Sequence, residues 1–312
     1  MKLSIVTPSF NQGQYLGQTI ASVLASTRLP DEYFVIDGGS GDNSVEVIRA
    51  YEGKLTSWRS EKDRGQADAI NKGLKMASGD ILGWLNSDDI ILPGAYEAVI
   101  AAFEQYPAAA MVYGNAYSID ENGQTINLQK FAPYTLTDMM AFKIICQPAV
   151  FFRRSALQKA GLLDESYHYL LDHHLWLRLA QHGEMIYLPQ TLAAARYHPA
   201  AKNVAHTNRF GEEAFRIIDW MQGDPNLASL YSQYEKQVKS GAYRLDGYYL
   251  MEGRDHWGGL RAYAKAIMEQ PSVVSKELPH ILYGLLGLLH LGGIKTLYKR
   301  LRKKSYQQDR IN

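Results

Sequence analysis

Apolar positions in the first 115 or so residues follow two alternating patterns. Short, nearly continuous apolar runs at Leu3–Val6, Phe34–Ile36 and Ile81–Leu85 predict buried β-strands. Between these runs, at residues 16–24 and 67–77, apolar residues recur at helical spacing. Strands that alternate with helices predict an α/β fold with a doubly wound, mostly parallel sheet. Further elements are predicted at Val45–Tyr51, Leu55–Arg59, Ala95–Tyr106 and Met111–Tyr113.

The alternation ends after residue 115, where the sequence predicts a β-hairpin, two more strands and a helix. The hairpin, Tyr117–Ile126, turns at Asp120-Glu121-Asn122-Gly123, a run of turn-forming residues. Pro8 and Pro189 are expected to end the first and the last strand of the sheet. The remaining elements are predicted at Ala149–Phe152, Asp172–Gln181 and Met185–Leu188.

From about residue 210 onward the apolar spacing is helical only. Tyrosines from Tyr243 onward predict a helical hairpin that turns near Gly253. No internal repeat or long linker separates this part of the chain from the α/β part. We therefore predict an α/β domain at residues 1–205 and a helical C-terminal region at residues 206–312.

The charge balance excludes one class of partner. The 312 residues include 33 Lys and Arg against 32 Asp and Glu, so no basic field favours nucleic acid. The single cysteine, Cys146, cannot form an intramolecular disulfide and fits a reducing compartment. The apolar run at Met1–Pro8 is too short for a signal peptide. We therefore expect a cytoplasmic protein with no nucleic-acid partner.

The strand predicted at Ile81–Leu85 ends in four small polar or acidic residues, Asn86-Ser87-Asp88-Asp89. In open α/β sheets, ligands bind outside the carboxyl ends of the strands. Adjacent carboxylates such as Asp88 and Asp89 repel each other unless a cation lies beside them. Because no Cys or His is nearby in the sequence, the oxygen ligands favour Mg²⁺ or Mn²⁺ over Zn²⁺. The alternative is an acidic loop that binds no metal.

Three more polar clusters follow predicted strands: Thr7–Asn11, Asp37 with the glycine-rich loop up to Ser44, and Asp63–Asp68 at a helix start. Glycines let the backbone approach a flat ligand, and a carboxylate can accept from a base N–H or a ribose hydroxyl. Neither Gly-x-Gly-x-x-Gly nor the P-loop motif occurs in these clusters, so they do not predict a phosphate-cradling loop. We expect all four clusters to lie at one edge of the sheet.

Four blocks of the sequence, in this order, resemble those of family 2 glycosyltransferases. The blocks are Ser4–Asn11, Val35–Ser40, Gly65–Gly73 and Trp84–Asp89. The resemblance covers about residues 1–200 and implies that the α/β domain has the GT-A fold. It also implies an inverting enzyme that uses a nucleotide-diphosphate sugar and a divalent cation, Mn²⁺ or Mg²⁺.

The resemblance implies roles for residues at matching positions near the nucleotide. Pro8 and Ser9 would line the base pocket, and Asp37 would bind the base, most often uracil. Arg64 and Asp68 lie where similar enzymes contact the donor. One departure follows Asp37, where this chain has a glycine and many relatives have a second aspartate.

Asn86, Ser87 and Asp88 occupy the Asp-x-Asp position of the family, so Asp88 would bind the metal that bridges the diphosphate. Asn86 and Ser87 would contact the nucleotide sugar, and Asp89 would lie beside them, toward the transferred sugar. The second departure is Asn86 itself, which replaces the first acid of the motif. An amide can accept from a ribose hydroxyl but is a poorer ligand than a carboxylate for a hard cation.

The catalytic base is expected further along the chain. Asp172, near a predicted helix start, matches the acidic position of the family's base, and an inverting transfer needs a carboxylate to accept the proton of the attacking hydroxyl. The alternative is that Asp172 is a helix N-cap. His198 either reaches the diphosphate or metal or is a plain loop residue, and Gln147 either faces the acceptor or belongs to a turn. The Gln-x-x-Arg-Trp motif of processive synthases is absent, which favours addition of one sugar per visit.

Near the C-terminus an apolar run, Leu278–Ile294, is followed by six basic residues between Lys295 and Lys304. The run is short for a membrane span and contains histidines and glycines. One interpretation places it on the anionic inner face of the cytoplasmic membrane, as a peripheral anchor. The other packs it on the catalytic domain with a solvated basic tail.

Together these features predict an inverting, metal-dependent glycosyltransferase with a UDP-sugar donor. The family implies a glycan or lipid-linked saccharide acceptor in surface polysaccharide synthesis. A sugar nucleotidyltransferase is one rival, but such enzymes usually carry a glycine-rich, lysine-containing loop where this chain has Thr7–Asn11. A catalytically silent GT-A-like binding module is another, and the presence of both Asp88 and Asp172 argues against it.

Overall fold

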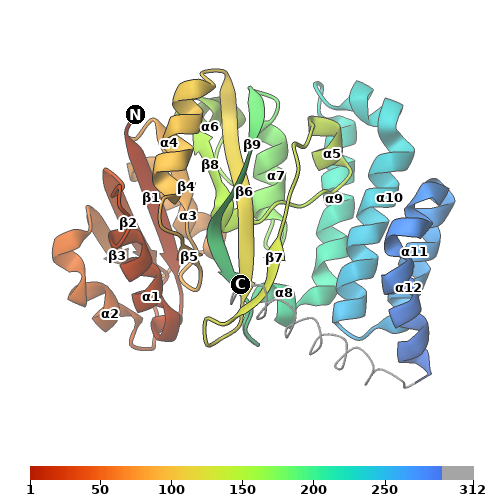
Figure 1. Ribbon diagram of the computed structural model, residues 1–312, viewed down its shortest axis with the longest axis horizontal. Coiled ribbons are helices and arrows are strands. Elements are labelled where there is room, and N and C mark those ends of the chain that lie inside the picture. Colours follow the sequence, from red (N-terminus) through yellow and green to blue (C-terminus); the bar gives the residue numbers. More distant parts are fainter. Residues whose placement is uncertain (290–312) are drawn as a thin grey trace, which may run out of the picture. The chain divides into compact units, whose positions relative to one another are not determined.

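The structure, a computed structural model, describes residues 1–289, which form two compact units (Figure 1). The first unit comprises Met1–Leu136 and Ile144–Arg196. The second comprises Thr137–Lys143 and the chain from Tyr197 onward. All strands of the described residues belong to the first unit, whereas the second is helical. The domain boundary predicted at residue 205 stays a prediction.

The secondary structure matches most of the predicted elements to within a few residues. The strands are β1 (Leu3–Ser9), β2 (Glu32–Asp37), β3 (Ser57–Ser60), β4 (Ile81–Trp84), β5 (Ile90–Ile91), β6 (Ala109–Ile119), β7 (Thr125–Gln129), β8 (Val150–Arg153) and β9 (Glu184–Arg196). The helices that accompany them are α1 (Gly13–Leu24), α2 (Ser44–Ala50), α3 (Gln66–Met76), α4 (Ala95–Gln105), α6 (Arg154–Ala160) and α7 (Leu171–Leu179), with the 3₁₀ helices η1 (Glu52–Lys54) and η2 (Gln147–Ala149). The other helices are α5 (Leu136–Met140), α8 (Lys202–Ala205), η3 (Thr207–Arg209), α9 (Phe210–Gly223), α10 (Ala228–Glu252), α11 (His256–Glu269), η4 (Pro271–Val273) and α12 (Val274–Leu288).

The nine strands form one sheet in the order β3-β2-β1-β4-β8-β6-β9-β5, and β7 pairs with β6 outside this path. β3, β2, β1 and β4 are parallel neighbours, and β6 is parallel to β9. β8 lies between β4 and β6 and is antiparallel to both. The predicted hairpin is confirmed as the antiparallel pair of β6 and β7. The predicted α/β sheet is therefore confirmed, with antiparallel strands inserted in its second half.

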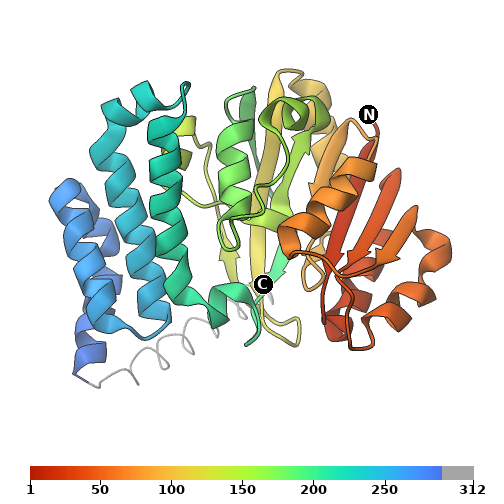
Figure 2. The ribbon, with the colours of Figure 1, turned by 180° about the vertical axis from the view of Figure 1, so that it is seen from behind.

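Helices cover both faces of the sheet, α1, α2 and α4 in front of it in Figure 1 and α3, α6 and α7 in Figure 2. Every residue of β1 and β4 is buried, which explains why these strands are nearly continuous apolar runs. On one face Ile5 packs in a cluster with Leu16 and Ile20 of α1. On the other, the Trp84 ring stacks on Trp176 of α7, with the ring centroids 5.0 Å apart.

The prediction that Pro8 ends the first strand is wrong, because Pro8 lies within β1 and pairs with Ile36 of β2. In a parallel ladder, successive residues direct their N–H and C=O groups to alternate sides of the strand. The C=O of Val6 accepts from the N–H of Leu85 on the β4 side. Pro8, two residues on, faces the same side, where β4 has already ended at Trp84. A residue at this position has no strand partner for its N–H, so the proline costs no hydrogen bond of the sheet.

The prediction that Pro189 ends a strand is also wrong. β9 continues through Pro189 to Arg196. Its pairing with β6 shifts register between Gly114 and Asn115, opposite this proline. Pro189 and Gln190 have no partner in β6 at this shift, so a proline is tolerated there. The strand consequently delivers Arg196 to the edge of the sheet where the polar clusters lie.

In the second unit, α10 and α11 form the predicted helical hairpin, and the chain turns at Gly253 between them. α12 packs on this hairpin through a glycine, because a side chain at Gly284 would collide with Met251 and Leu260. No helix within residues 1–289 is long and apolar enough to cross a membrane. Part of the predicted membrane segment, from residue 290, lies outside the described residues.

Glu32, the first residue of β2, connects the amino ends of the neighbouring strands. Its carboxylate accepts hydrogen bonds from Lys2 Nζ at 2.7 Å, Ser4 Oγ at 2.6 Å and the Ser78 N–H at 2.8 Å. Burial alone would raise the pKa of Glu32, but these donors outweigh burial and lower it from 4.5 to about 2. The charged form of Glu32 therefore stabilises the folded state.

We expect Glu32→Gln to remove a pH-dependent part of the stability. A carboxyl whose pKa is lowered by folding stabilises the protein above its unfolded pKa of 4.5, and this stabilisation is lost as the pH falls towards 2. The shift corresponds to about 2–3 kcal/mol. Urea unfolding from about pH 7 to about pH 2.5 should show the variant and wild type converging in free energy of unfolding. The exposed Glu46→Gln is the control, and a Glu32→Gln difference that is constant with pH would contradict this account.

Candidate active site

The carboxyl ends of β1, β2 and β4 meet at one edge of the sheet. β1 and β2 are in parallel register with Ser9 opposite Asp37, and β4 lies on the other side of β1. These three strand ends carry three of the four predicted polar clusters. The fourth, at the start of α3, joins them because Gln66 Nε2 donates to Asn86 Oδ1 at 2.8 Å. The expectation that the four clusters share one edge is confirmed.

Asp37 is fully buried, and its carboxylate is surrounded by donors from the chain itself. Oδ2 accepts from the N–H groups of Gly39 at 3.1 Å and Ser40 at 2.9 Å. It also accepts from Ser60 Oγ at 2.7 Å, while Oδ1 accepts from Ser40 Oγ at 2.6 Å. A carboxylate has about four acceptor positions, so these bonds occupy them. Asp37 thus organises the glycine-rich loop, and its contact with a nucleotide base stays a prediction.

The glycine-rich loop is tied to the loop that follows β1. Asn11 Oδ1 accepts from the Gly41 N–H at 2.8 Å, and the Asn11 N–H donates to Ser40 Oγ at 2.8 Å. Gly38 occupies the position where many relatives have a second aspartate. A Cβ at Gly38 would lie 2.5 Å from Asp63 Oδ2, so a side chain there would collide with that carboxylate. The departure from the family pattern therefore has a packing reason.

Pro8 and Ser9, the predicted base-pocket residues, are both buried at the end of β1. The C=O of Ser9 accepts from the Gly38 N–H at 2.8 Å. The Ser9 hydroxyl, in contrast, is buried and has no hydrogen-bond partner among residues 1–289. A buried hydroxyl left without a partner costs about 1–3 kcal/mol. A ligand that donates or accepts a hydrogen bond here would remove that cost.

Asn86 is the centre of a hydrogen-bond network beyond β4. Besides accepting from Gln66, it donates through Nδ2 to Asp89 Oδ2 at 3.1 Å and to Gln147 Oε1 at 3.0 Å. Gln147 in turn donates to the C=O of Trp84 at 2.8 Å, which places this residue in the framework of the site. An aspartate at position 86 could make neither of the Nδ2 bonds. The network therefore explains why an amide stands at the first position of the acidic motif.

Asn86–Asp89 form a turn, hereafter the acid turn, which is closed by the Asp89 N–H donating to the C=O of Asn86 at 3.1 Å. Ser87 is buried within it and Asp88 is partly exposed. Burial, followed by the charge of Asp88, raises the pKa of Asp89 well above its ordinary value, although bonds from Arg196 and Asn86 oppose the shift. The acid turn thus concentrates negative charge in a poorly solvated place, where a cation would be stabilising.

Arg196, the last residue of β9, holds the acid turn in place. Its N–H donates to Asp89 Oδ1 at 2.9 Å and its Nε donates to the C=O of Asp88 at 2.8 Å. Its Nη2 donates to Gln18 Oε1 at 2.9 Å, and the guanidinium carbon lies 4.7 Å from the centroid of the Tyr15 ring. The local sequence predicts no role for Arg196, because its partners precede it by 107 and 108 residues. A hint in the sequence is an arginine directly after an apolar strand, where a buried charge requires a partner.

Arg64 and Asp68 bind each other across the first turn of α3. Arg64 Nη2 lies 3.1 Å from Asp68 Oδ1 and 2.9 Å from Glu165 Oε2, and Lys72 Nζ lies 3.4 Å from Asp68 Oδ2. Burial alone would raise the pKa of Asp68, but hydrogen bonds from Arg64 and the charge of Lys72 lower it. The Arg64 side chain is 72% exposed, so its guanidinium remains accessible to an anion. Donor contacts by this pair stay predictions.

Asp172 lies in the first turn of α7, and its Oδ1 accepts from the N–H of His173 at 2.7 Å. The N-cap position belongs to Leu170, so the alternative of Asp172 as an N-cap is wrong. A carboxylate in this first turn is stabilised by the helix dipole. Burial raises the pKa of the Cys146 thiol, and the charges of Asp89 and Asp172 raise it further. Cys146 therefore has both carboxylates in its neighbourhood.

His198 lies in the second unit, whereas the acid turn belongs to the first. It is buried, and its C=O accepts from the N–H of Ala201 at 2.9 Å. Its contact with a metal or a diphosphate stays a prediction.

Within residues 1–289, no cluster of three or more His, Cys, Asp and Glu side chains could hold a metal ion by itself. The acid turn nevertheless suits a hard cation that takes other ligands from a diphosphate. Asp88 offers a partly exposed carboxylate beside the buried Asp89. Mg²⁺ usually keeps several waters and binds through one or two carboxylates and substrate phosphates. The donor set of the acid turn is therefore compatible with the predicted Mn²⁺ or Mg²⁺.

Comparison with known proteins gives the family. The family model described as glycosyl transferase family 2 matches residues 4–161. An uncharacterized glycosyltransferase of Mycobacterium tuberculosis is 32% identical over 181 residues, which are 57% of this chain and 68% of that protein. The chain belongs to glycosyl transferase family 2. The predicted glycosyltransferase is thereby confirmed, and all four polar clusters fall inside the matched residues.

Two solved structures share the fold of this family 2 glycosyltransferase. S. aureus TarS 1–349 in complex with UDP-GlcNAc is 16% identical, with a TM-score of 0.65 that covers 99% of this chain and 92% of that chain. The mannosyltransferase PcManGT from Pyrobaculum calidifontis, in complex with GDP-Man and Mn²⁺, is 14% identical, with a TM-score of 0.63 over 95% and 87% of the two chains. The predicted GT-A fold with a helical C-terminal region is confirmed.

We expect Asn86→Asp to lower the free energy of unfolding by about 2 kcal/mol at neutral pH. The variant loses both Nδ2 bonds and adds a negative charge beside Asp89. Urea unfolding of variant and wild type measures the difference. Asn122→Asp, in the exposed turn before β7, is the matched control and should change stability by less than about 0.5 kcal/mol. If Asn86→Asp were as stable as wild type, the network would not have the structural role described.

Proposed function

We propose that this family 2 glycosyltransferase transfers a sugar from a nucleotide-diphosphate donor, in particular a UDP-sugar, to a saccharide acceptor. The observation that carries the proposal is the acid turn, which is held by Arg196 at the carboxyl end of β4 beside the loops after β1 and β2. Further support comes from the complexes of TarS with UDP-GlcNAc and of PcManGT with GDP-Man and Mn²⁺.

In this proposal the loops after β1 and β2 bind the nucleotide. Pro8 and Ser9 line the base pocket, and the buried Ser9 hydroxyl gains a partner when the base or ribose binds. Asp37 binds the base, whose N–H then takes the place of Ser40 Oγ at Asp37 Oδ1. Arg64, exposed at the start of α3, approaches the diphosphate. Its partner Asp68 fixes the direction of that guanidinium.

The acid turn would hold the cation and the sugar. Asp88 ligates Mn²⁺ or Mg²⁺, and Asp89 lies beside it toward the transferred sugar. Asn86 and Ser87 contact the nucleotide sugar, with Asn86 also keeping Asp89 in place. When bound, the cation would offset the negative charge that develops on the leaving diphosphate.

Asp172 would serve as the catalytic base. The acceptor hydroxyl loses its proton to the Asp172 carboxylate while its oxygen attacks the anomeric carbon, and the bond between that carbon and the diphosphate oxygen breaks on the opposite side. One such displacement inverts the configuration of the anomeric carbon. The stacking of Trp176, one turn after Asp172 on α7, on Trp84 at the end of β4 supports this assignment. The acceptor would be a glycan or a lipid-linked saccharide of a surface polysaccharide.

The proposal predicts that UDP raises the thermal midpoint of the protein and that Mn²⁺ increases this effect. A ligand that binds only the folded state stabilises it by about 2.7 kcal/mol at a hundredfold excess over its Kd. The measurement is thermal unfolding with UDP, GDP and TDP, each with and without Mn²⁺. A shift confined to GDP or TDP would contradict the UDP donor, and no shift with any nucleotide would contradict donor binding altogether and favour the silent module.

Two variants separate nucleotide binding, measured by the same thermal shift, from sugar transfer, measured by an activity assay. Asp88→Asn should abolish the Mn²⁺-dependent part of the shift, whereas Asp172→Asn should keep the full shift and lose transfer by about 10²-fold or more, the usual contribution of a general base. Asp219→Asn, on an exposed face of α9, is the control and should behave as wild type. Near-wild-type transfer by Asp88→Asn or Asp172→Asn would overturn the role given to that residue. Pyrophosphate release from a nucleoside triphosphate and a sugar phosphate would instead indicate a nucleotidyltransferase.

We further propose that the protein binds an anionic membrane surface through α12. One face of α12 packs on its neighbours, since side chains at Gly284 and Gly287 would collide with Met251 and His256 respectively. The other face is apolar and exposed. Its leucines, which are 42–67% exposed, are Leu278, Leu282, Leu285, Leu288 and Leu289.

The charge of the same part of the sequence supports an anionic membrane as the occupant of this face. From Leu278 to Gln308 the sequence has six basic residues and no acidic residue. Each lysine or arginine near an anionic lipid surface contributes about 1 kcal/mol of attraction. Apolar side chains on one face of a helix and basic residues beside it are typical of helices that lie in the plane of a membrane interface. A second copy of the chain would bring the same positive charges together.

We expect the protein to float with vesicles that contain about a third phosphatidylglycerol and to detach at about 0.5 M salt, because salt screens the attraction. Replacing Leu282 and Leu285 together by Asn should abolish flotation. Met268→Gln, which removes an 82% exposed apolar side chain from α11, is the control. Failure to bind these vesicles, or self-association that the double variant prevents, would overturn the membrane proposal.

A further inference from the structure

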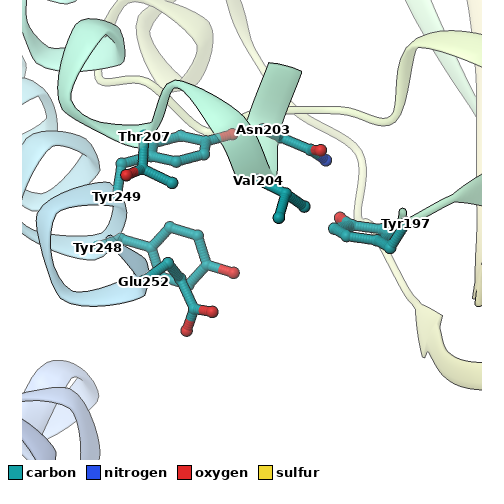
Figure 3. Close-up of a pocket in the computed structure, with 7 residues that line it drawn as sticks. All are labelled: Tyr197, Asn203, Val204, Thr207, Tyr248, Tyr249 and Glu252. Carbon is teal, nitrogen blue, oxygen red and sulfur yellow. The ribbon is translucent and has the colours of Figure 1, made fainter. Parts of the chain in front are cut away.

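The second unit contains a pocket of about 90 Å³ that uses none of the donor-binding residues proposed above (Figure 3). Tyr248 and Glu252, from the last turns of α10, form one side, and Tyr197 lies opposite them. Asn203 and Val204 of α8 lie between the two sides. All seven lining residues belong to the second unit.

The chemistry of the lining is that of a site for a neutral polyhydroxylated ligand. Three of the seven lining residues are tyrosines, whose rings offer flat apolar faces and whose hydroxyls offer polar tips. The polar residues among the others are Asn203, Thr207 and Glu252, and none of the seven is basic. A sugar ring combines an apolar C–H face with hydroxyls at its rim. Aromatic walls with a few polar groups match both features.

Asn203 carries an unused acceptor in this pocket. Its Oδ1 is buried and has no hydrogen-bond partner among residues 1–289. Buried side-chain acceptors nearly always have a partner, so an acceptor without one among these residues suits a donor supplied by a ligand. A sugar hydroxyl can both donate to Asn203 Oδ1 and accept from a neighbouring tyrosine hydroxyl.

Two of the three tyrosine rings, those of Tyr248 and Tyr249, are held by other rings before any ligand arrives. Tyr249 stacks on Phe210, with ring centroids 3.7 Å apart and planes 11° apart. Tyr248 meets the edge of Tyr249 at 5.3 Å and that of His280 at 5.7 Å. Rings held from several sides lose little freedom on binding, which favours affinity for a weakly interacting ligand.

The charge of Glu252 selects against anionic ligands. Glu252 lies beside Tyr248 in the lining of the pocket. Its carboxylate would repel an incoming phosphate or carboxylate. With no basic residue in the lining, a nucleotide or a diphosphate has no counter-charge here. A neutral sugar has no such penalty.

We propose that this pocket binds one neutral sugar ring of the acceptor, with the ring against Tyr248 and a hydroxyl on Asn203. The inference rests on the proposed function for the identity of the acceptor as a saccharide. It goes further in giving the acceptor a binding site in the helical unit, outside the residues matched by the family model.

The test is saturation-transfer NMR of the full chain with methyl glycosides of glucose, galactose and N-acetylglucosamine, at about 10 mM each. At least one glycoside should receive saturation on its ring C–H protons. Tyr248→Ala should abolish the signal, and Asn203→Ala should weaken binding about five-fold, as expected for loss of one neutral hydrogen bond. Tyr234→Ala, on the same helix but outside the lining, should leave the signal unchanged.

Because Tyr248 is 40% exposed, its replacement should not unfold the protein, and the thermal midpoint of each variant checks this. Absence of saturation transfer to all three glycosides, or equal signals from wild type, Tyr248→Ala and Asn203→Ala, would overturn the pocket. The UDP-dependent thermal shift, measured on the same samples, reports the proposed function separately. Loss of the sugar signal with an intact UDP shift therefore refutes the pocket alone, whereas sugar binding without any nucleotide shift refutes the donor proposal.

Discussion

A buried arginine must be paired, and in this glycosyltransferase that requirement organises the candidate site. The N–H and Nε of Arg196 bind the Asp89 carboxylate and the Asp88 backbone, and its guanidinium reaches Gln18 and the Tyr15 ring. The length of β9 makes this possible. Only because the strand passes Pro189 through a bulge does the chain reach the edge of the sheet at Arg196. The position of the acidic residues thus depends on a strand that is remote from them in sequence.

The acid turn also shows how the chain limits the charge that it buries. Burial and the charge of Asp88 already raise the pKa of Asp89. A third carboxylate at position 86 would add to that repulsion, whereas the Asn86 amide donates to Asp89 and joins it to Gln147. Asp37 follows the same principle, because its buried charge is balanced by donors of its own loop and by Ser60 at the end of β3. Asp37 and Asp89 are thus each surrounded by groups that hold the carboxylate in one orientation.

The sequence predicts what depends on local pattern and misses what depends on remote partners. Strands such as β1 and β4 were predictable because burial on both faces leaves a continuous apolar run. The predictions that Pro8 and Pro189 end strands were wrong, because whether a proline ends a strand depends on its pairing with the neighbouring strand. The common location of the four polar clusters was predictable, because the carboxyl ends of parallel strands lie at the same edge of a sheet. The role of Arg196 and the bond from Ser60 to Asp37 were not predictable, because these partners meet only in the folded sheet.

The bond between Arg196 and Asp89 spans 107 residues, and this separation gives the site an order of assembly. A ribosome adds about 5–20 residues per second, so roughly 5–20 s pass between synthesis of Asp89 and of Arg196. During that interval the growing chain holds two adjacent carboxylates without the arginine that later fixes them. Contacts of such long range also form late in refolding, after local helices and hairpins. The acidic centre of this enzyme therefore cannot acquire its final geometry until synthesis has reached Arg196, the last residue of the first unit.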